Sequence, residues 1–151
     1  MRMSLKEARR LGIEIPKTPR KKRVRETPSG VHEIGKIQTL AIPGFHPVSV
    51  NTLLSLHYFS RSKVKRSQQE IVGFYAREQK IEPAAGKRLV SIVCKGWRQG
   101  GIPDEDNIKK VLLDNLASLG LLVDDSPKWC HSVASIERSK EWETIVALEN
   151  I

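Results

Sequence analysis

Residues 103–125 read PDEDNIKKVLLDNLASLGLLVDD, and this segment carries the clearest structural signal in the sequence. Its apolar residues recur at spacings of three and four, which predicts an amphipathic helix with one broad core face. Asp104 is typical of the residue that caps the N-terminus of a helix, and Gly120 is typical of the residue that ends one. We therefore expect the clearest helix of the protein over Asp104 to Leu119.

The sequence on both sides of this helix predicts strands. Arg88 to Lys95 (RLVSIVCK) is β-branched and mostly apolar, which is typical of a central strand. Lys36 to Ile42 (KIQTLAI) alternates apolar and polar residues. Two more strands are expected after the helix, at Lys128 to Arg138 and Trp142 to Glu149, and residues 139–141 would form a hairpin turn between them.

A second helix is expected over Ser67 to Lys80, because Ser67 and Glu70 have the spacing of a capping box. The basic residues 61–66 before it are expected to form a loop. The resulting order β-α-β-α-β-β predicts a small α+β domain, with one mixed sheet packed against two helices, over residues 35–151. Residues 1–34 carry ten Lys or Arg against four Glu and are expected to form a basic flexible N-terminal arm.

The chain has 151 residues and a formal net charge of +9, so a polyanionic partner is expected, nucleic acid before an anionic membrane. No apolar run is long enough to span a bilayer, and no secretory signal stands at the start, so a cytoplasmic protein is expected. Cys94 and Cys130 are expected to be reduced, small hydrophobic residues, since the four scattered histidines offer no zinc pattern. The arm would lie along phosphates or act only as a solubilising tail.

An acidic cluster stands inside this basic sequence. Residues 104–125 hold six acidic residues, with only Lys109 and Lys110 to offset them, whereas residues 61–98 carry ten Lys or Arg against three Glu. Carboxylates beside phosphates repel them unless a divalent cation bridges the two. The pattern therefore favours metal-dependent chemistry on a phosphodiester.

A helical projection places Asp106, Lys110 and Asp114 on the side away from the core face. Such a row also fits an ordinary solvated face with i,i+4 ion pairs, and Asp104 also fits a simple N-cap. The pair Asp124–Asp125 also fits a turn. The combination of D-x-D at the helix start and D-D after its end favours a metal-binding site, provided that the chain doubles back after the helix.

Residues 103–125 resemble the signature of the RusA-type Holliday junction resolvases, a family of crossover junction endodeoxyribonucleases. That signature has an Asp-x-Asp-Asn opening, a Lys one turn later, an Asp in mid-helix, a Gly stop and a terminal Asp-Asp. The matching residues are Asp104, Asp106, Asn107, Lys110, Asp114, Gly120, Asp124 and Asp125. A Pro–Ser–Asn loop at Pro47, Ser49 and Asn51 matches a further family feature, so the resemblance spans residues 36–150.

The resemblance implies a homodimer that nicks opposing strands of four-way DNA symmetrically, in recombination and repair, in a bacterium or a phage. The catalytic residues that it implies are Asp104, Asp106, Asp125 and Lys110, and the three aspartates among them would bind the metal. Asp114 and Asp124 would support these residues. Oxygen-only ligands favour Mg²⁺, with Mn²⁺ as a substitute.

The expected DNA-binding residues are Arg61, Lys63, Lys65, Arg66, Lys95, Trp97 and Arg98, with Lys21, Lys22 and Arg23 from the arm. Trp97 lies on a loop with glycines on both sides and would either stack on an unpaired base at the branch point or pack at the end of the sheet. Trp129 and Trp142 are expected in the core or the dimer interface. This sequence departs from the family in its added arm and in fewer arginines just before Asp104.

Three other functions fit parts of the sequence. A non-catalytic DNA-binding protein on the same fold would keep the basic surface but would not need the acidic set. A nuclease acting on flaps, forks or single-stranded overhangs would carry the same residues. An adaptor whose arm binds RNA or an acidic partner would depend on residues 1–34 alone.

Overall fold

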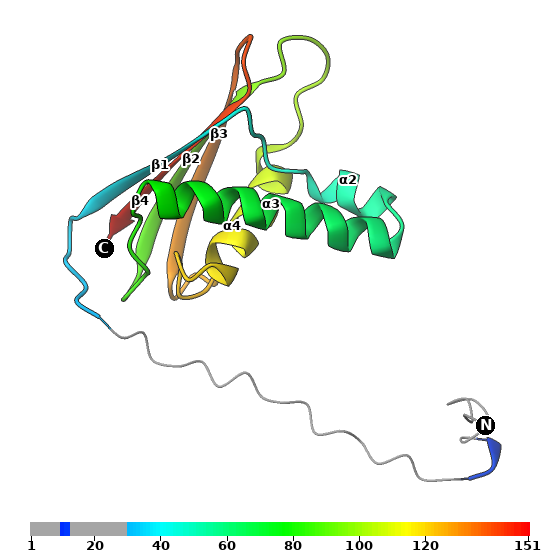
Figure 1. Ribbon diagram of the computed structural model, residues 1–151, viewed down its shortest axis with the longest axis horizontal. Helices are drawn as coiled ribbons and strands as arrows, with labels where there is room; N and C mark the ends of the chain where they lie inside the picture. Colours follow the sequence, from blue (N-terminus) through cyan, green and yellow to red (C-terminus); the bar gives the residue numbers. More distant parts are fainter. Residues whose placement is uncertain (1–9, 13–29) are drawn as a thin grey trace.

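The computed structural model describes residues 10–12 and 30–151, and the second range forms a domain of one sheet and three helices (Figure 1). The strands are β1 (Ile37–Pro43), β2 (Arg88–Gly96), β3 (Cys130–Arg138) and β4 (Glu143–Asn150). The helices are α2 (Val50–Ser55), α3 (Tyr58–Glu78) and α4 (Glu105–Ser118). The α+β class and the single mixed sheet are confirmed, whereas the expected number of two helices is wrong because the short α2 precedes α3. Residues 1–9 and 13–29 of the expected arm lie outside the described ranges.

The sheet has the strand order β1-β4-β2-β3, in which β2 and β3 are parallel and the other pairs are antiparallel. The central position expected for β2 is therefore confirmed. The hairpin expected at residues 139–141 is wrong, because β2 lies between β3 and β4. The connection crosses the end of β2 instead, where the amide of Ser139 donates to the carbonyl of Gly96 over 2.9 Å.

One face of the sheet forms the core. Val90, Ile92 and Val146 are almost fully buried on that face, and they pack with Val72 of α3 and Leu112 of α4 in one hydrophobic cluster. Residues of the opposite face are only half-buried or exposed in every strand. Both long helices therefore cover the same side of the sheet. Across the described residues, no helix is long and apolar enough to cross a membrane.

Helix α3 begins nine residues before the start expected from the sequence, at Tyr58 instead of Ser67. The basic residues 61–66 are consequently helical, and their prediction as a loop is wrong. Residues 58–66 contain neither Gly nor Pro, so nothing interrupts the helix before the capping-box pattern at residue 67. The result is a long helix with a row of cationic side chains.

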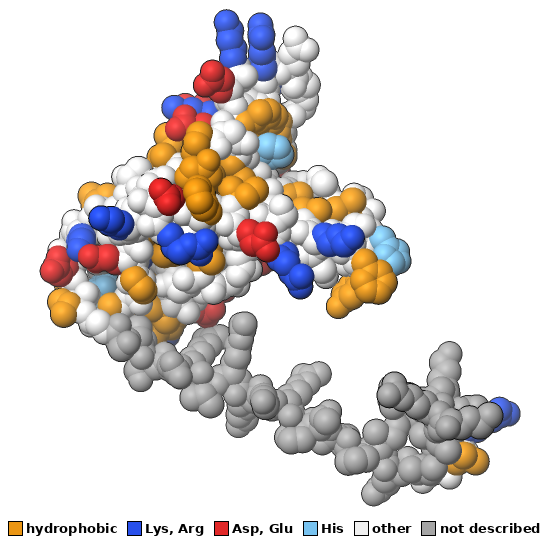
Figure 2. Space-filling model, viewed as in Figure 1, with side chains coloured by type: hydrophobic (Ala, Val, Ile, Leu, Met, Phe, Trp, Pro, Cys, Tyr) orange, Lys and Arg blue, Asp and Glu red, His pale blue; other side chains and the backbone are white. Residues whose placement is uncertain are grey.

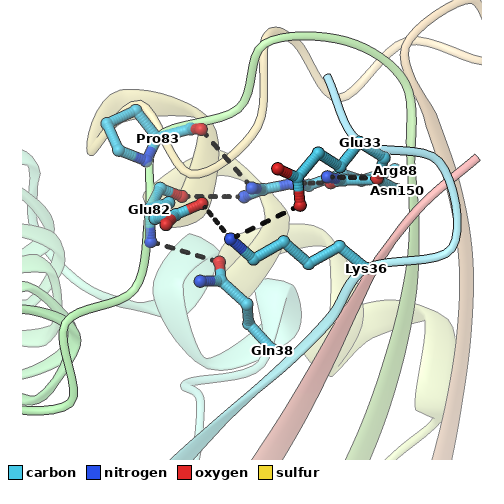
Figure 3. A network of polar contacts seen from close by, with 7 residues as sticks. All are labelled: Glu33, Lys36, Gln38, Glu82, Pro83, Arg88 and Asn150. Atoms are coloured by element: carbon cyan, nitrogen blue, oxygen red, sulfur yellow. Dashed lines mark hydrogen bonds and ion pairs between the residues drawn. The ribbon is translucent and has the colours of Figure 1, made fainter. Parts of the chain in front are cut away.

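A buried arginine joins the sheet to the loops on either side of it (Figure 3). The Arg88 side chain is 3% exposed, and its Nε donates to Oδ1 of Asn150 over 2.9 Å. Its Nη1 donates to the carbonyls of Glu82 over 3.0 Å and Leu121 over 2.8 Å. Lys36 closes the network at the surface through a 2.8 Å ion pair with Glu82. Arg88 thereby fixes the segment that follows α4, which leads to the Asp124–Asp125 pair.

Candidate functional site

Helix α4 begins as the sequence predicts. Asp104 is its N-cap, and the Asp104 carboxylate accepts the amide of Asp106 over 3.2 Å. The predicted core face is confirmed by Ile108, Leu112 and Leu116, which are all at most 1% exposed. The helix therefore presents its acidic residues at the surface, at a fixed distance from the sheet.

The chain doubles back after α4. The amides of Leu121 and Leu122 both donate to the carbonyl of Leu116, over 2.9 Å and 3.3 Å, and both leucine side chains are buried. This turn brings Asp125 alongside the middle of the helix, where its carboxyl group forms a hydrogen bond with that of Asp114. Two carboxylates from separate segments are thus in contact.

The pKa of Asp114 is raised above its ordinary value, first by partial burial and then by the hydrogen bond and negative charge of Asp125. Lys65 of α3 and Lys110 of α4 act in the opposite direction, because their positive charges favour the ionised form. Two neighbouring carboxyl groups resist being ionised together, so the pair favours a shared proton or a bound cation. The Asp114–Asp125 pair is therefore a place where a proton or a cation would be stabilised, whereas the two lysines beside it favour an anion such as a phosphate.

The three aspartates expected to bind metal have different partners. Asp104 caps α4, Asp106 forms a 3.4 Å ion pair with Lys109, and Asp125 contacts Asp114. Among the described residues, no group of three or more His, Cys, Asp or Glu side chains is placed to hold a metal ion. The set of Asp104, Asp106 and Asp125 stays a prediction, and the two-carboxylate contact is the part of a metal site that the geometry provides.

A basic groove runs along α3 beside this pair. It has a volume of about 550 Å³ and is lined by Ser62, Lys65, Arg66, Gln69, Glu70, Gly73, Arg77 and Leu119. Lys65 and Arg66 are among the residues expected to bind DNA, whereas Arg77 was not singled out from the sequence. Lys65 both lines the groove and acts on Asp114, so the groove adjoins the carboxylate pair.

Two of the expected DNA-binding residues have structural partners. Arg61 donates to the carbonyls of Leu56 over 3.0 Å and Leu54 over 3.2 Å, and so holds the corner between α2 and α3. Lys95 pairs in register with Glu137 and Glu143 on the two neighbouring strands. The Arg61 guanidinium is therefore engaged within the protein, whereas Lys95 only lies beside two acidic residues in the sheet.

The remaining expected DNA contacts fall into two groups. Lys63 and Arg98 are exposed. Lys21, Lys22 and Arg23 lie outside the described residues. The structure therefore offers Lys63 and Arg98 to solvent, and the contribution of the arm stays a prediction.

Three aromatic rings meet at one end of the sheet. His46 lies 4.2 Å from Trp142 and 5.5 Å from Trp97, and the two tryptophan rings are 4.8 Å apart, all measured between ring centroids. Trp142 is 37% exposed and Trp97 is half-buried, so the Trp142 side chain is not a core residue. Trp129, by contrast, packs under Lys128 at 5.0 Å. No pattern in the sequence singles out His46, because its ring partners are about 50 and 100 residues away.

Comparison with protein-family models gives no match for this chain, and comparison with curated proteins gives none either. The contact between Asp114 and Asp125, the basic groove and the ring cluster are therefore the features from which a function is inferred. All three lie within residues 30–151.

Proposed function

We propose that this chain is a Mg²⁺-dependent endonuclease that cuts branched DNA, with four-way junctions as the preferred substrate. The observation that carries the proposal is the contact between Asp114 and Asp125, beside Lys65 and Lys110, on a protein of net charge +9. A surface that only holds DNA has no use for paired carboxylates, because they repel phosphate. The RusA-like signature over residues 103–125 supports the same reaction.

Asp125 would hold the metal ion together with carboxylates of α4, which are either Asp104 and Asp106 at the start of the helix or Asp114 in its middle. All of these donors are carboxylate oxygens, which suit Mg²⁺ or Mn²⁺. When bound, such an ion lowers the pKa of a water molecule and stabilises charge on a phosphoryl oxygen. The choice between Asp114 and the Asp104–Asp106 group as partners of Asp125 is addressed by a variant comparison below.

The protein's own residues would position the DNA. Lys65 and Arg66 line the groove along α3 and would contact phosphates of the strand that passes the carboxylate pair. Lys110 lies one helical turn from both Asp106 and Asp114, where its charge would offset negative charge developing on the phosphate. Paired cuts in opposing strands require two such sites, so we also propose a homodimer, in a bacterial or phage-infected cytoplasm.

A cleavage assay tests the proposal directly. A labelled four-way junction and a linear duplex of the same sequence are incubated with the protein, with Mg²⁺, with Mn²⁺ and with chelator. The junction should be nicked only when metal is present, and much faster than the duplex. Asp106→Asn should bind the junction at least as well as the parent but cut it at least about 100-fold more slowly.

Glu105→Gln is the matched control, because Glu105 is an exposed acidic residue on the same turn of α4 and has no assigned role. It should cut like the parent. Junction binding without metal-dependent cutting would leave a non-catalytic DNA-binding protein as the better proposal. Equal cutting of flaps, forks and junctions would instead make the protein a general branch nuclease. Light scattering on the same samples measures whether the protein is a dimer.

A further inference from the structure

We propose that the ring cluster of His46, Trp97 and Trp142 is a binding site for one unpaired nucleotide, with the base and the phosphate held on opposite sides of Trp97. The proposal rests on the proposed function only in taking nucleic acid as the ligand. It names a separate site, at the end of the sheet beyond Gly96.

The base side is a neutral hollow. It has a volume of about 370 Å³ and is lined by His46, Pro47, Val48, Ser49, Thr52, Trp97, Gly101, Ile102 and Pro103. Ring faces and aliphatic groups in this lining suit the flat surface of a base, and the Ser49 and Thr52 hydroxyls can hydrogen-bond to its edge. None of the lining side chains is a Lys, Arg, Asp or Glu.

The phosphate side is a cationic hollow. It has a volume of about 420 Å³ and is lined by Trp97, Arg98, Gln99, Ser139, Lys140 and Trp142. Arg98 and Lys140 are exposed and come from different loops. Figure 2 shows Lys or Arg side chains extending from this end of the molecule, above a group of hydrophobic side chains and a histidine. Both hollows are lined by Trp97, so a nucleotide whose base stacks on this ring would have Arg98 and Lys140 near its phosphate.

The backbone around Trp97 is arranged to hold this ring. Trp97 has a φ of +46°, which is costly for a large side chain, and such strain concentrates at functional sites. Two hydrogen bonds maintain the loop: Arg138 donates to the carbonyl of Trp97 over 2.7 Å and to that of Gly100 over 3.1 Å. The ring is therefore fixed before any ligand arrives, which lowers the entropy cost of binding.

The hollow reaches the residue before the N-cap of α4. Pro103 lines the base side, and Asp104 follows it as the helix cap. A nucleotide bound at Trp97 would consequently lie beside the Asp104–Asp106 end of the proposed active site. The strand that enters the site would then present one base to Trp97, outside the stacked duplex.

The test measures binding without metal or cleavage. A short fluorescein-labelled single strand and the same strand with abasic sites in place of its bases are titrated with the full chain in EDTA. The parent protein should prefer the strand with bases. Trp97→Ala should lose about 5- to 150-fold in affinity for that strand and almost nothing for the abasic strand, since stacking on one ring has that range of effect. Trp97→Tyr should restore most of the loss.

Trp129→Ala is the control, because it removes a tryptophan ring outside the cluster and should leave the preference for bases unchanged. Arg98→Gln and Lys140→Gln should weaken both strands equally. An equal loss for both strands in Trp97→Ala, or a parent protein without preference, overturns the proposal. If Trp97→Ala unfolds, Trp97→Gly removes the ring and also accepts the positive φ. Failed cleavage would leave these results intact, so the two proposals fail separately.

Discussion

Gly96 is the position where one added carbon should disturb the ring cluster most. A Cβ built there lies 2.1 Å from Cε3 and 2.5 Å from Cζ3 of Trp142, whose ring rests directly on the glycine backbone. Gly96 also has a φ of +148°, a conformation that residues with a side chain rarely adopt. Gly96→Ala therefore has to displace the Trp142 ring and strain the end of β2 at the same time.

The two effects have separate magnitudes. Forcing alanine into a glycine-only conformation costs about 1–3 kcal/mol. Pushing a packed ring out of place costs a similar amount, about 1–3 kcal/mol. We expect Gly96→Ala to lower the free energy of unfolding by about 2–6 kcal/mol, a large share of the roughly 5–15 kcal/mol that a domain possesses.

Gly100→Ala separates the two effects. Gly100 lies on the same loop with a φ of +87°, but a Cβ there meets no atom within 4 Å, so only backbone strain should appear, about 1–2 kcal/mol. Urea unfolding followed by tryptophan fluorescence measures both variants, and near-UV circular dichroism reports the ring cluster. Equal losses of stability in the two variants, with an unchanged spectrum for Gly96→Ala, would refute the assigned packing of Trp142.

Three other outcomes follow from buried or paired groups. Because the pKa of Asp114 is raised in the folded state, the stability of the protein in EDTA should fall as the pH rises above 3.8, the ordinary pKa of this carboxyl group. Asp114→Asn should remove this fall and should have a higher melting temperature at neutral pH, as measured by thermal melts. Arg88→Lys should cost about 3 kcal/mol in urea unfolding, since a single ammonium group cannot reach Asn150, Glu82 and Leu121 together. Burial raises the pKa of Cys94 to about 11, so a disulfide reagent at pH near 8 should modify this thiol only as the protein unfolds.

Local sequence signals predicted the parts of the fold that depend on neighbouring residues. The N-cap at Asp104 and the positive φ of 77° at Gly120 follow from side-chain chemistry within one turn, and the structure has both. The separation of β3 and β4 depends instead on β2, which takes the position between them and pairs with both. The connection over residues 139–142 is compatible with either arrangement, so the sequence does not distinguish a hairpin from a crossing over β2.

The candidate site also has one part that the sequence predicts and one part that depends on the tertiary fold. The D-x-D and D-D motifs mark which aspartates to consider, but the contact of Asp125 with Asp114 depends on a turn after α4. That turn is fixed by buried Leu121 and Leu122 and by the Arg88 hydrogen bond to the Leu121 carbonyl. Arg88 is 33 residues before Leu121, and no spacing rule connects them.

The position of the metal along α4 can be decided by one pair of variants. Asp106 and Asp114 are eight residues apart, which is about 12 Å along a helix, so one ion bound by Asp125 cannot contact both ends equally. Asp104→Asn removes a charge but keeps the cap, because Asn caps helices as well as Asp does. Asp114→Asn removes the partner that Asp125 has in the structure.

We expect Mg²⁺ to raise the melting temperature of the parent and of Asp104→Asn, and to leave that of Asp114→Asn nearly unchanged, because bound metal stabilises only the folded state that holds it. This outcome would place the first ion at the Asp114–Asp125 pair, with Asp104 needed later, when DNA brings phosphate to the start of α4. Loss of the Mg²⁺ effect in Asp104→Asn alone would place the ion at the D-x-D motif, and Asp125 would then have to leave Asp114 to reach it.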